Sequence, residues 1–507
     1  MTIKLLLFSK EYSGIMEMTQ KILSLIYHRL KRLAEITLAA RFYTSCISYI
    51  KAASWMAYSF NISFRDDELE DLTFRLSKNI KKKHCETNAD SVVLIDSFAH
   101  DNHGLTQQYI RAIMAQQRHL LYITDASPNS ENAVGLYGDL NNYPCATIVH
   151  VPNRNKLAGL KRAQFIYNEI IKAHPYKVFM HLTPNAVEVI IAMHALSDKI
   201  IKYQINLTDH TFWLGATACD YSLEFRPYGF SVSEQARKID RSKLLLCPYY
   251  PIVDDIPFKG FPFEKKNECV IFSGGSSYKF GDDKNTFFVM MKRLLDENPS
   301  LIWVHAGDNM DGIKEKMMSV MSVQYLRRIY LVGIRNDIAE VFRHIDIYIN
   351  SYPFGGGLMN LYAAHFSKPV VSLKRDVYTS ANEILGQLKD VSVDFTTIDD
   401  LCVEVHRLVE CADYRIQRGK QLQDSVIKVN KFNELFDKLC TSNTNILPIP
   451  DKSREVHLPS SGELYDCRSS IVKIIKWRGL FVPYCQKEAL LYCPSKMISV
   501  IKRYFRK

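Results

Sequence analysis

The sequence lacks a run of apolar residues long enough to cross a membrane, although 47% of its 507 residues are apolar. Its opening, "MTIKLLLFSK", holds an apolar run too short for the core of a signal peptide. The uncharged stretch "AASWMAYSFNISF" also falls well short of the roughly 18 apolar residues that a spanning helix needs. These absences predict a cytoplasmic protein.

Patterns that hold metals or nucleotides in other enzymes are missing as well. The twelve cysteines are scattered, with no C-x-x-C pair and no cluster of cysteine with histidine, so we expect reduced thiols. There is no H-E-x-x-H or Asp-x-Asp, and the glycine-rich segments match neither the ATPase nor the dinucleotide-binding pattern. The sequence therefore predicts no metal and no bound cofactor.

The net charge of +11 is concentrated at the two ends of the chain. Residues 468–507 hold ten basic residues and one acid, and the middle of the chain is nearly neutral. A nucleic-acid enzyme would more often carry positive charge across its working surface, so no nucleic-acid partner is predicted. The tail places Ile498, Ile501 and Phe505 on one face of a basic helix, which predicts peripheral contact with an anionic inner membrane surface. The alternative is a helix that packs back on the first domain.

Short apolar strand runs alternate with helical segments in two successive series. The first runs from "SVVLIDSF" to "KIIKYQIN" and the second from "CVIFSGG" to "KPVVSL". This alternation predicts an α/β protein with two doubly wound parallel sheets, joined by the proline-rich stretch Cys247–Phe263. The predicted units are a basic helical extension (1–87), a first Rossmann-like domain (88–260), a second domain (261–440) and a basic tail (441–507).

Three consecutive glycines stand between a strand run and a helical run in "NSYPFGGGLMN" (Asn350–Asn360). This arrangement places free backbone N–H groups at a helix N-terminus, which suits a phosphate, and glycine lets the oxygens of a ligand approach closely. A tight turn that requires positive φ is the alternative, but one glycine would serve it. The residues of the predicted phosphate site are Gly355, Gly356, Gly357, Leu358, Met359 and Asn360.

A second polar loop, "FSGGSSYKFG" (Phe272–Gly281), follows the first strand of the second series. Glycines and hydroxyls again stand at a strand end, now with a lysine whose ammonium suits a diphosphate. A solvated surface lysine is the alternative. The residues of this predicted site are Ser273, Gly274, Gly275 and Lys279.

Two loops of the first domain offer a general base. In "NLTDHTFWLG" (Asn206–Gly215), Asp209 and His210 follow a strand, and a histidine has an intrinsic pKa near neutrality. A packed, hydrogen-bonded histidine is the alternative there. The rival loop is "SFAHDNHG", which supplies Asp101 and His103.

These domains and loops resemble the GT-B glycosyltransferases over about residues 88–440. In that fold, the C-terminal domain binds a nucleotide sugar and the acceptor enters from the N-terminal domain. The sequence resembles the inverting branch that includes O-GlcNAc transferase and bacterial adhesin-modifying enzymes. Bacterial surface-polysaccharide transferases share its "D-H-x-F-W-x-G" stretch.

The resemblance implies a role for individual residues. It gives diphosphate contact to Lys279 and places His210 near the acceptor. Gly357, Leu358 and Met359 stand where the branch often has His-Thr-Thr, so backbone amides would hold the phosphates. The Glu-x7-Glu pattern of retaining enzymes is absent, which favours inversion. The segment "LVGIRND" would hold the nucleotide base through Val332, Gly333, Ile334 and Arg335.

The predicted activity is transfer of a hexosyl or N-acetylhexosaminyl group from a UDP- or GDP-sugar. The acceptor would be a glycan, as in polysaccharide biosynthesis, a lipid-linked glycan or a protein. His210, held by Asp209, would take the acceptor proton, and Lys279 with the glycine-turn amides would stabilise the leaving diphosphate. The alternatives are a nucleotide-sugar 2-epimerase of the same fold and a nucleotide-sugar-binding protein without activity.

Overall fold

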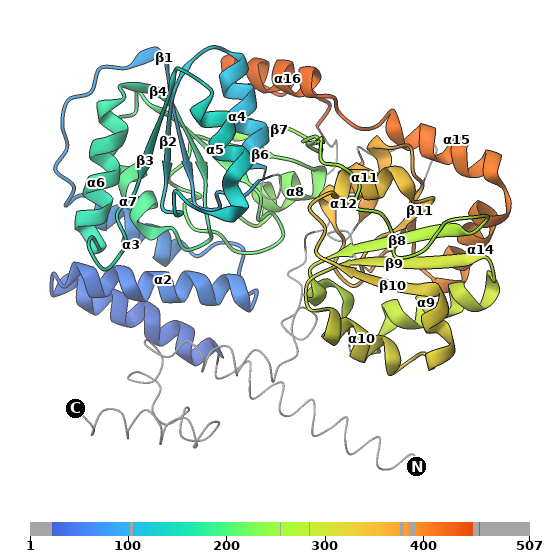
Figure 1. Cartoon of the computed structure of the whole chain (residues 1–507). Helices are drawn as coiled ribbons and strands as arrows, with labels where there is room; N and C mark the ends of the chain where they lie inside the picture. The colour runs from blue at the N-terminus through green and yellow to red at the C-terminus, as the bar shows by residue number, and fades with distance from the viewer. Residues whose placement is uncertain are drawn as a thin grey trace.

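Two parallel sheets, each covered by helices, follow one another along the chain and lie side by side (Figure 1). This is the two-domain α/β architecture that the sequence predicts. No helix in the described part of the chain is long and apolar enough to span a membrane. The computed structural model describes residues 23–101, 105–253, 255–282, 284–375, 380–385, 392–449 and 456, so the predicted basic tail lies almost entirely outside the described residues.

The N-terminal sheet has seven parallel strands in the order β3-β2-β1-β4-β5-β6-β7. The strand order reverses between β1 and β4, and ligands of such sheets bind at the carboxyl ends beside that point. The apolar runs seen in the sequence are buried because helices cover both faces. The strands are β1 (Asn88–Asp96), β2 (His119–Thr124), β3 (Ala146–His150), β4 (Pro175–His181), β5 (Ile201–Asn206), β6 (Tyr221–Glu224) and β7 (Leu244–Leu246).

The helices of this domain turn their apolar faces to the sheet. In α6, for example, Ile166, Tyr167 and Ile170 recur at helical spacing and are buried. The helices are α4 (Thr106–Ala115), η1 (Glu131–Ala133), α5 (Val134–Asn141), α6 (Gly159–Lys172), α7 (Val187–Ala195), α8 (Pro227–Gln235) and η2 (Arg241–Lys243).

Three N-terminal helices pack beneath this domain and belong to its core: residues 23–39, α2 (Tyr43–Ser59) and α3 (Asp67–Ser77) (Figure 1). These helices also contact the "DHTFWLG" loop. The buried carboxylate of Glu70 accepts hydrogen bonds from the backbone N–H groups of Gly215 at 2.8 Å and Ala216 at 3.1 Å, and from the Thr217 hydroxyl at 2.6 Å. The N-terminal extension therefore fixes the conformation of that loop.

The C-terminal sheet has six parallel strands in the order β10-β9-β8-β11-β12-β13. Its strands are β8 (Cys269–Gly275), β9 (Leu301–Gly307), β10 (Ile329–Gly333), β11 (Ile347–Ile349), β12 (Val370–Leu373) and β13 (Asp394–Phe395). Its helices are η3 (Ser277–Phe280), α9 (Thr286–Glu297), α10 (Met310–Met318), η4 (Val323–Arg328), α11 (Ile338–His344), α12 (Gly357–His365), α13 (Ala381–Ile384), α14 (Ile398–Glu410) and α15 (Ala412–Gln423).

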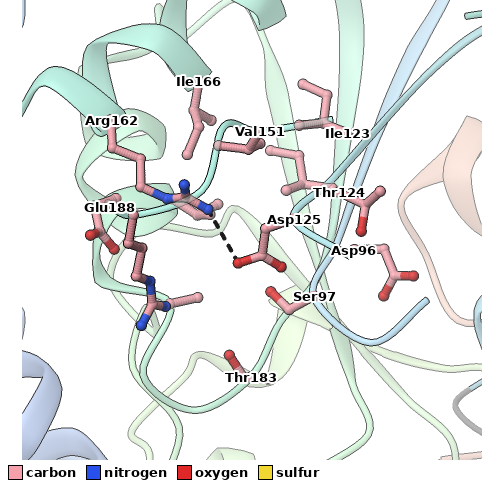
Figure 2. Close-up of a pocket in the computed structure, with 14 residues that line it drawn as sticks. Asp96, Ser97, Ile123, Thr124, Asp125, Val151, Arg162, Ile166, Thr183 and Glu188 are labelled. Atoms are coloured by element: carbon pink, nitrogen blue, oxygen red, sulfur yellow. Dashed lines mark hydrogen bonds and ion pairs between the residues drawn. The ribbon is translucent and has the colours of Figure 1, made fainter. Parts of the chain in front are cut away.

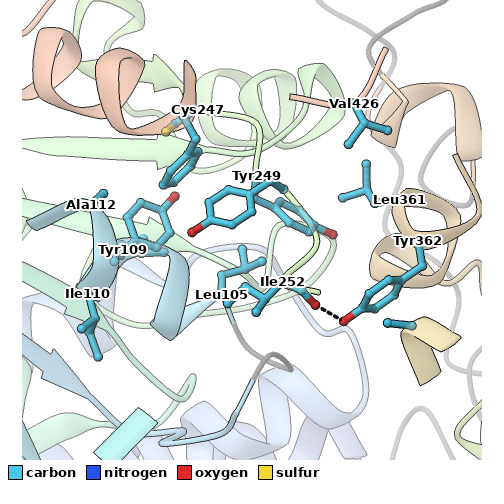
Figure 3. Close-up of a cluster of buried hydrophobic side chains, with 14 of the residues drawn as sticks. Leu105, Tyr109, Ile110, Ala112, Cys247, Tyr249, Ile252, Leu361, Tyr362 and Val426 are labelled. Atoms are coloured by element: carbon cyan, nitrogen blue, oxygen red, sulfur yellow. Dashed lines mark hydrogen bonds between the residues drawn. The ribbon is translucent and has the colours of Figure 1, made fainter. Parts of the chain in front are cut away.

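One hydrophobic core runs through both domains and the linker (Figure 3). The Tyr362 hydroxyl of α12 donates to the carbonyl of Ile252 in the linker at 2.6 Å. The last described helix, α16 (Val429–Ser442), returns to the N-terminal domain, where the ring of Phe432 lies 5.7 Å from that of Tyr109. The sequence-based boundary at residue 440 differs here, because α16 follows the C-terminal domain in sequence but packs on the N-terminal one.

Replacing Glu70 with alanine removes the acceptor of these buried N–H groups. We expect Glu70→Ala to lower the free energy of unfolding by about 2–3 kcal/mol, measured by urea denaturation. The matched control is Glu68→Ala, because Glu68 is exposed on the same helix and, among the described residues, forms an ion pair with Lys31 alone. Equal stability of the two variants would contradict the bracing role of Glu70.

Candidate functional site

The two predicted phosphate loops meet at one edge of the C-terminal sheet. They follow β8 and β11, which are neighbours in that sheet. A Cβ atom at Gly274 would lie 2.9 Å from the methyl group of Met359, so the start of α12 sits directly on the end of β8. The rings of Tyr278 and Phe354 are 6.1 Å apart.

Asn350 fixes the glycine turn. Its Oδ1 accepts from the N–H of Gly356 at 2.8 Å, and its Nδ2 donates to the Ser372 hydroxyl at 3.1 Å. The Gly356 amide is therefore already used, which corrects its inclusion among the free phosphate donors. The helix α12 begins at Gly357, its N-cap residue Gly356 has no side chain to cap it, and no described side chain accepts from the first-turn N–H groups. The positive end of the helix is left open to an anion.

Packing explains why residue 357 is a glycine, and the sequence alone did not reveal this. A Cβ atom there would lie 2.7 Å from the Tyr249 hydroxyl and 3.5 Å from Cδ1 of Ile384. The absent side chain of Gly357 thus makes room for the linker between the domains. Asn360, three residues further along α12, is buried, and no hydrogen-bond partner of its Oδ1 is found among the described residues.

Lys279 lies beside the turn as a half-buried cation. Its stem runs along Gly275, whose Cβ atom would lie 3.6 Å from the lysine Cδ and whose φ of +141° favours glycine. Among the described residues, no acid or hydrogen-bond acceptor pairs with the Lys279 ammonium. Burial lowers the pKa of Lys279. An anion bound here would restore the favourable environment that the ammonium lacks.

Ser273 belongs to the core rather than to the phosphate site. Its hydroxyl accepts from Nε1 of Trp303 at 2.8 Å and lies 2.8 Å from Nδ1 of His305. Burial lowers the pKa of His305 to about 3, so this ring is neutral near pH 7. The assignment of Ser273 to diphosphate binding is therefore corrected, because both neighbours already occupy its hydroxyl.

The predicted nucleotide-base segment follows β10 at the same sheet edge. Gly333 has a φ of +69°, and the side chain of Ile334 is 79% exposed. Val332 packs against the core that includes the linker. Arg335 donates to Asp337 at 2.7 and 2.6 Å and to the Gly260 carbonyl at 2.9 Å. The arginine side chain thus holds the linker, while the backbone of the preceding residues stays accessible.

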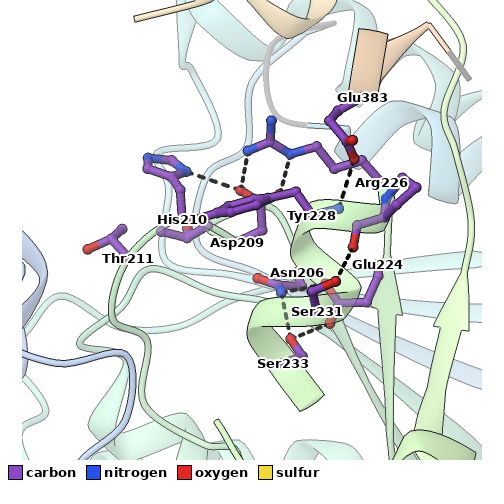
Figure 4. Close-up of polar contacts among 12 residues, drawn as sticks. Asn206, Asp209, His210, Thr211, Glu224, Arg226, Tyr228, Ser231, Ser233 and Glu383 are labelled. Atoms are coloured by element: carbon purple, nitrogen blue, oxygen red, sulfur yellow. Dashed lines mark hydrogen bonds and ion pairs between the residues drawn. The ribbon is translucent and has the colours of Figure 1, made fainter. Parts of the chain in front are cut away.

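Asp209 and His210 lie together on the N-terminal domain (Figure 4). The Asp209 Oδ1 is 3.2 Å from Nδ1 of His210, whose side chain is 41% exposed. A carboxylate at this position keeps the proton on Nδ1 and leaves Nε2 as the acceptor. The arrangement is that of a half-exposed base with an orienting carboxylate.

Arg226 holds Asp209 from the other side. It donates Nε to Asp209 Oδ2 at 2.5 Å and Nη2 to Oδ1 at 2.8 Å. Burial alone would raise the pKa of Asp209, but the guanidinium holds it well below its usual range. Gly229 permits this packing, since a Cβ atom there would lie 2.9 Å from Cβ of Asp209. Asp209 is therefore a fixed anion rather than a proton carrier.

The segment that holds Asp209 and His210 also contacts the C-terminal domain directly. The Tyr228 N–H donates to Oε2 of Glu383 at 3.0 Å, beside Ile384 at the glycine turn. Tyr249 stacks edge-on against Phe225 at 5.5 Å, and its hydroxyl reaches the Gly357 turn. Sequence reasoning missed Arg226, Tyr249 and Glu383, although Arg226 and Tyr249 do follow short strand-like runs.

The rival base loop has a different role. The two Asp101 carboxylate oxygens accept from the N–H groups of Gly135 at 2.8 Å and Leu136 at 2.7 Å. Asp101 therefore caps α5, and its carboxylate is already occupied, which argues against its assignment as a base. His103 lies outside the described residues.

A small pocket opens beside the carboxyl ends of β1 and β2 (Figure 2). Arg162 donates to Asp125 at 3.2 Å across it, and Ser97 and Thr183 add hydroxyls. These polar groups lie at the edge of the N-terminal sheet beside the point where its strand order reverses. Within the part of the chain that the structure describes, no three His, Cys, Asp or Glu side chains gather as a metal site would require.

No protein-family model matches the sequence, and no curated protein is similar to it. Solved structures share the fold. An O-GlcNAc transferase mutant from Thermobaculum terrenum is 11% identical, with a TM-score of 0.53, over 82% of this chain and 83% of that chain. HepE from Anabaena, in complex with UDP and glucose, is 12% identical, with a TM-score of 0.51, over 71% of this chain and all of that chain.

TarM from S. aureus, as a mutant in complex with fondaparinux, α-GlcNAc-glycerol and UDP, gives a further match. It is 9% identical, with a TM-score of 0.51, over 69% of this chain and 99% of that chain. At such identities the likeness concerns the fold. The chain has the two-domain fold of the GT-B glycosyltransferases.

Proposed function

We propose that the protein is a glycosyltransferase that moves a sugar from a nucleoside diphosphate sugar to an acceptor held by the N-terminal domain. The observation that carries this proposal is the meeting of two loops at one sheet edge: the Lys279 stem lies along Gly275, and Met359 of α12 lies against the neighbouring Gly274. Among the described residues, the Lys279 ammonium has no acidic partner. A cation and a helix N-terminus together suit the two negative phosphates of a leaving nucleoside diphosphate. UDP is the first candidate because HepE is described with UDP.

The reaction is a single displacement with inversion. His210 Nε2 takes the proton from an acceptor hydroxyl, whose oxygen then attacks the anomeric carbon. The bond from that carbon to the diphosphate oxygen breaks as the new bond forms. Lys279 and the amides of Gly357 and Leu358 stabilise the negative charge that develops on the leaving group. The acceptor is a glycan, a lipid-linked glycan or a protein.

A panel of nucleotide sugars tests the activity. We expect release of free UDP that increases when an oligosaccharide acceptor is added. Isomerised sugar without UDP release would identify an epimerase instead. Binding without turnover for every donor would leave a nucleotide-sugar-binding protein.

The Lys279 ammonium is tested by Lys279→Met, which keeps the length of the side chain. Loss of one charged donor should weaken UDP binding by about 10–100-fold, measured by calorimetry, and slow turnover by about 10²–10³. Because the pKa of Lys279 is lowered, wild-type affinity should fall as the pH rises through that pKa, and the variant should lack this fall. Lys284→Met, at an exposed lysine nearby, is the control, and equal behaviour of both variants would refute the role.

A pair of double variants tests the turn amide at Gly357. Gly357→Ala alone should clash with the Tyr249 hydroxyl, and adding Tyr249→Phe should relieve the clash because the ring carbon is 4.0 Å away. We expect Gly357→Ala/Tyr249→Phe to bind UDP nearly as well as the wild type. Gly357→Pro/Tyr249→Phe lacks only the N–H and should bind about tenfold more weakly. Equal affinities would show that this amide does not contact the diphosphate.

The base is tested by His210→Ala. Turnover with an acceptor should fall by about 10²–10⁴, while UDP affinity should hardly change because His210 lies on the other domain. His84→Ala, at an exposed histidine, should leave turnover unchanged. Wild-type turnover in His210→Ala would assign the base elsewhere.

A further inference from the structure

A second, larger groove lies on the N-terminal domain, away from the donor loops. Its volume is about 600 Å³, within the roughly 300–1,000 Å³ range of ligand pockets. Two walls form it: the turn before α2, and the loop between β3 and α6. The lining residues used below are Arg41, Thr44, Ser45, Arg154, Lys156 and Lys161.

The charge of this groove has one sign. Arg41, Arg154, Lys156 and Lys161 line it, and no acidic residue does. All four side chains are exposed, and in the described ranges none of them forms an ion pair. Lys292, by contrast, is paired with Asp296 at 2.6 Å. The groove therefore concentrates positive charge that the fold leaves uncompensated.

The backbone also contributes partial positive charge at the groove. Both α2 and α6 begin at the groove, and the apolar N-cap residues Phe42 and Ala158 offer no side-chain cap to either helix. Gly159 brings the two helix starts together, because a Cβ atom there would lie 2.8 Å from the Thr44 hydroxyl and its φ is +61°. Two positive helix ends thus converge with the four cations.

The groove also meets the small pocket beside β1 and β2. Arg154 lines both the groove and the pocket beside β1 and β2. Burial lowers the pKa of Arg162 in that pocket, and the charge of Arg154 adds to the lowering. A chain lying in the groove would therefore lead toward the edge of the sheet where transfer is proposed.

We propose that this groove binds an acidic acceptor glycan, whose carboxylate, sulfate or phosphate groups pair with its cations. The proposal rests on the proposed glycosyltransferase function and names the acceptor class. A glycan fits better than a membrane because the surface is hollowed rather than flat. The hydroxyls of Thr44 and Ser45, with the exposed ring of Phe42, add sugar-binding groups to the charges.

Fondaparinux, a sulfated pentasaccharide, is a suitable probe of the full-length protein, with neutral maltopentaose as its uncharged counterpart. We expect binding of the acidic probe that weakens with salt, and no binding of the neutral one. The variant Arg41→Glu/Lys156→Glu/Lys161→Glu should lose about tenfold or more in affinity. The control Lys266→Glu/Lys314→Glu/Lys420→Glu changes the charge equally on exposed lysines of the C-terminal domain and should bind normally.

UDP binding, measured on the same samples, separates the two proposals. If UDP binds but fondaparinux does not, or if both triple variants lose equal affinity, the groove proposal is wrong and the donor site stands. Binding to anionic phosphatidylglycerol vesicles that is lost in the groove variant, without fondaparinux binding, would also overturn it in favour of a membrane surface. Failure of the wild-type protein to bind UDP would instead refute the glycosyltransferase function.

Discussion

The packing of Tyr249 against Gly357 sets how closely the two domains meet. The linker tyrosine occupies the space that any other side chain at residue 357 would fill. Tyr362 and the linker carbonyl of Ile252 continue the same contact within one hydrophobic core. Because of this contact, the start of α12 and the Asp209–Arg226 pair lie on the two sides of one domain boundary.

The two domains contribute different chemical groups to the candidate site. The C-terminal side offers Lys279, whose ammonium has no acidic partner among the described residues, and a helix start whose N-cap is a glycine. The N-terminal side offers a histidine whose orienting carboxylate is itself held by an arginine. The N-terminal helices matter here too, since Glu70 fixes the loop that follows His210. On the proposed function, donor binding and proton removal would depend on separate parts of the fold.

The sequence predicted the two parallel sheets because their strands are continuous apolar runs, which only burial on both faces explains. It also located the loops at the ends of β8 and β11. It could not show that Ser273 turns into the core toward Trp303, because the direction of a side chain at a strand end depends on its neighbours. The sequence did not predict the roles of Arg226 and Tyr249 for a similar reason, since these roles arise from contacts between segments distant in sequence.

Hydrogen exchange with and without UDP tests the central claim most directly. If the diphosphate rests on the start of α12, UDP should slow exchange of the N–H groups of Gly357, Leu358 and Met359, which donate to no described side chain. The Gly356 amide, already bonded to Asn350, should change little and serves as an internal reference. Protection elsewhere, with unchanged exchange at these three amides, would contradict the account.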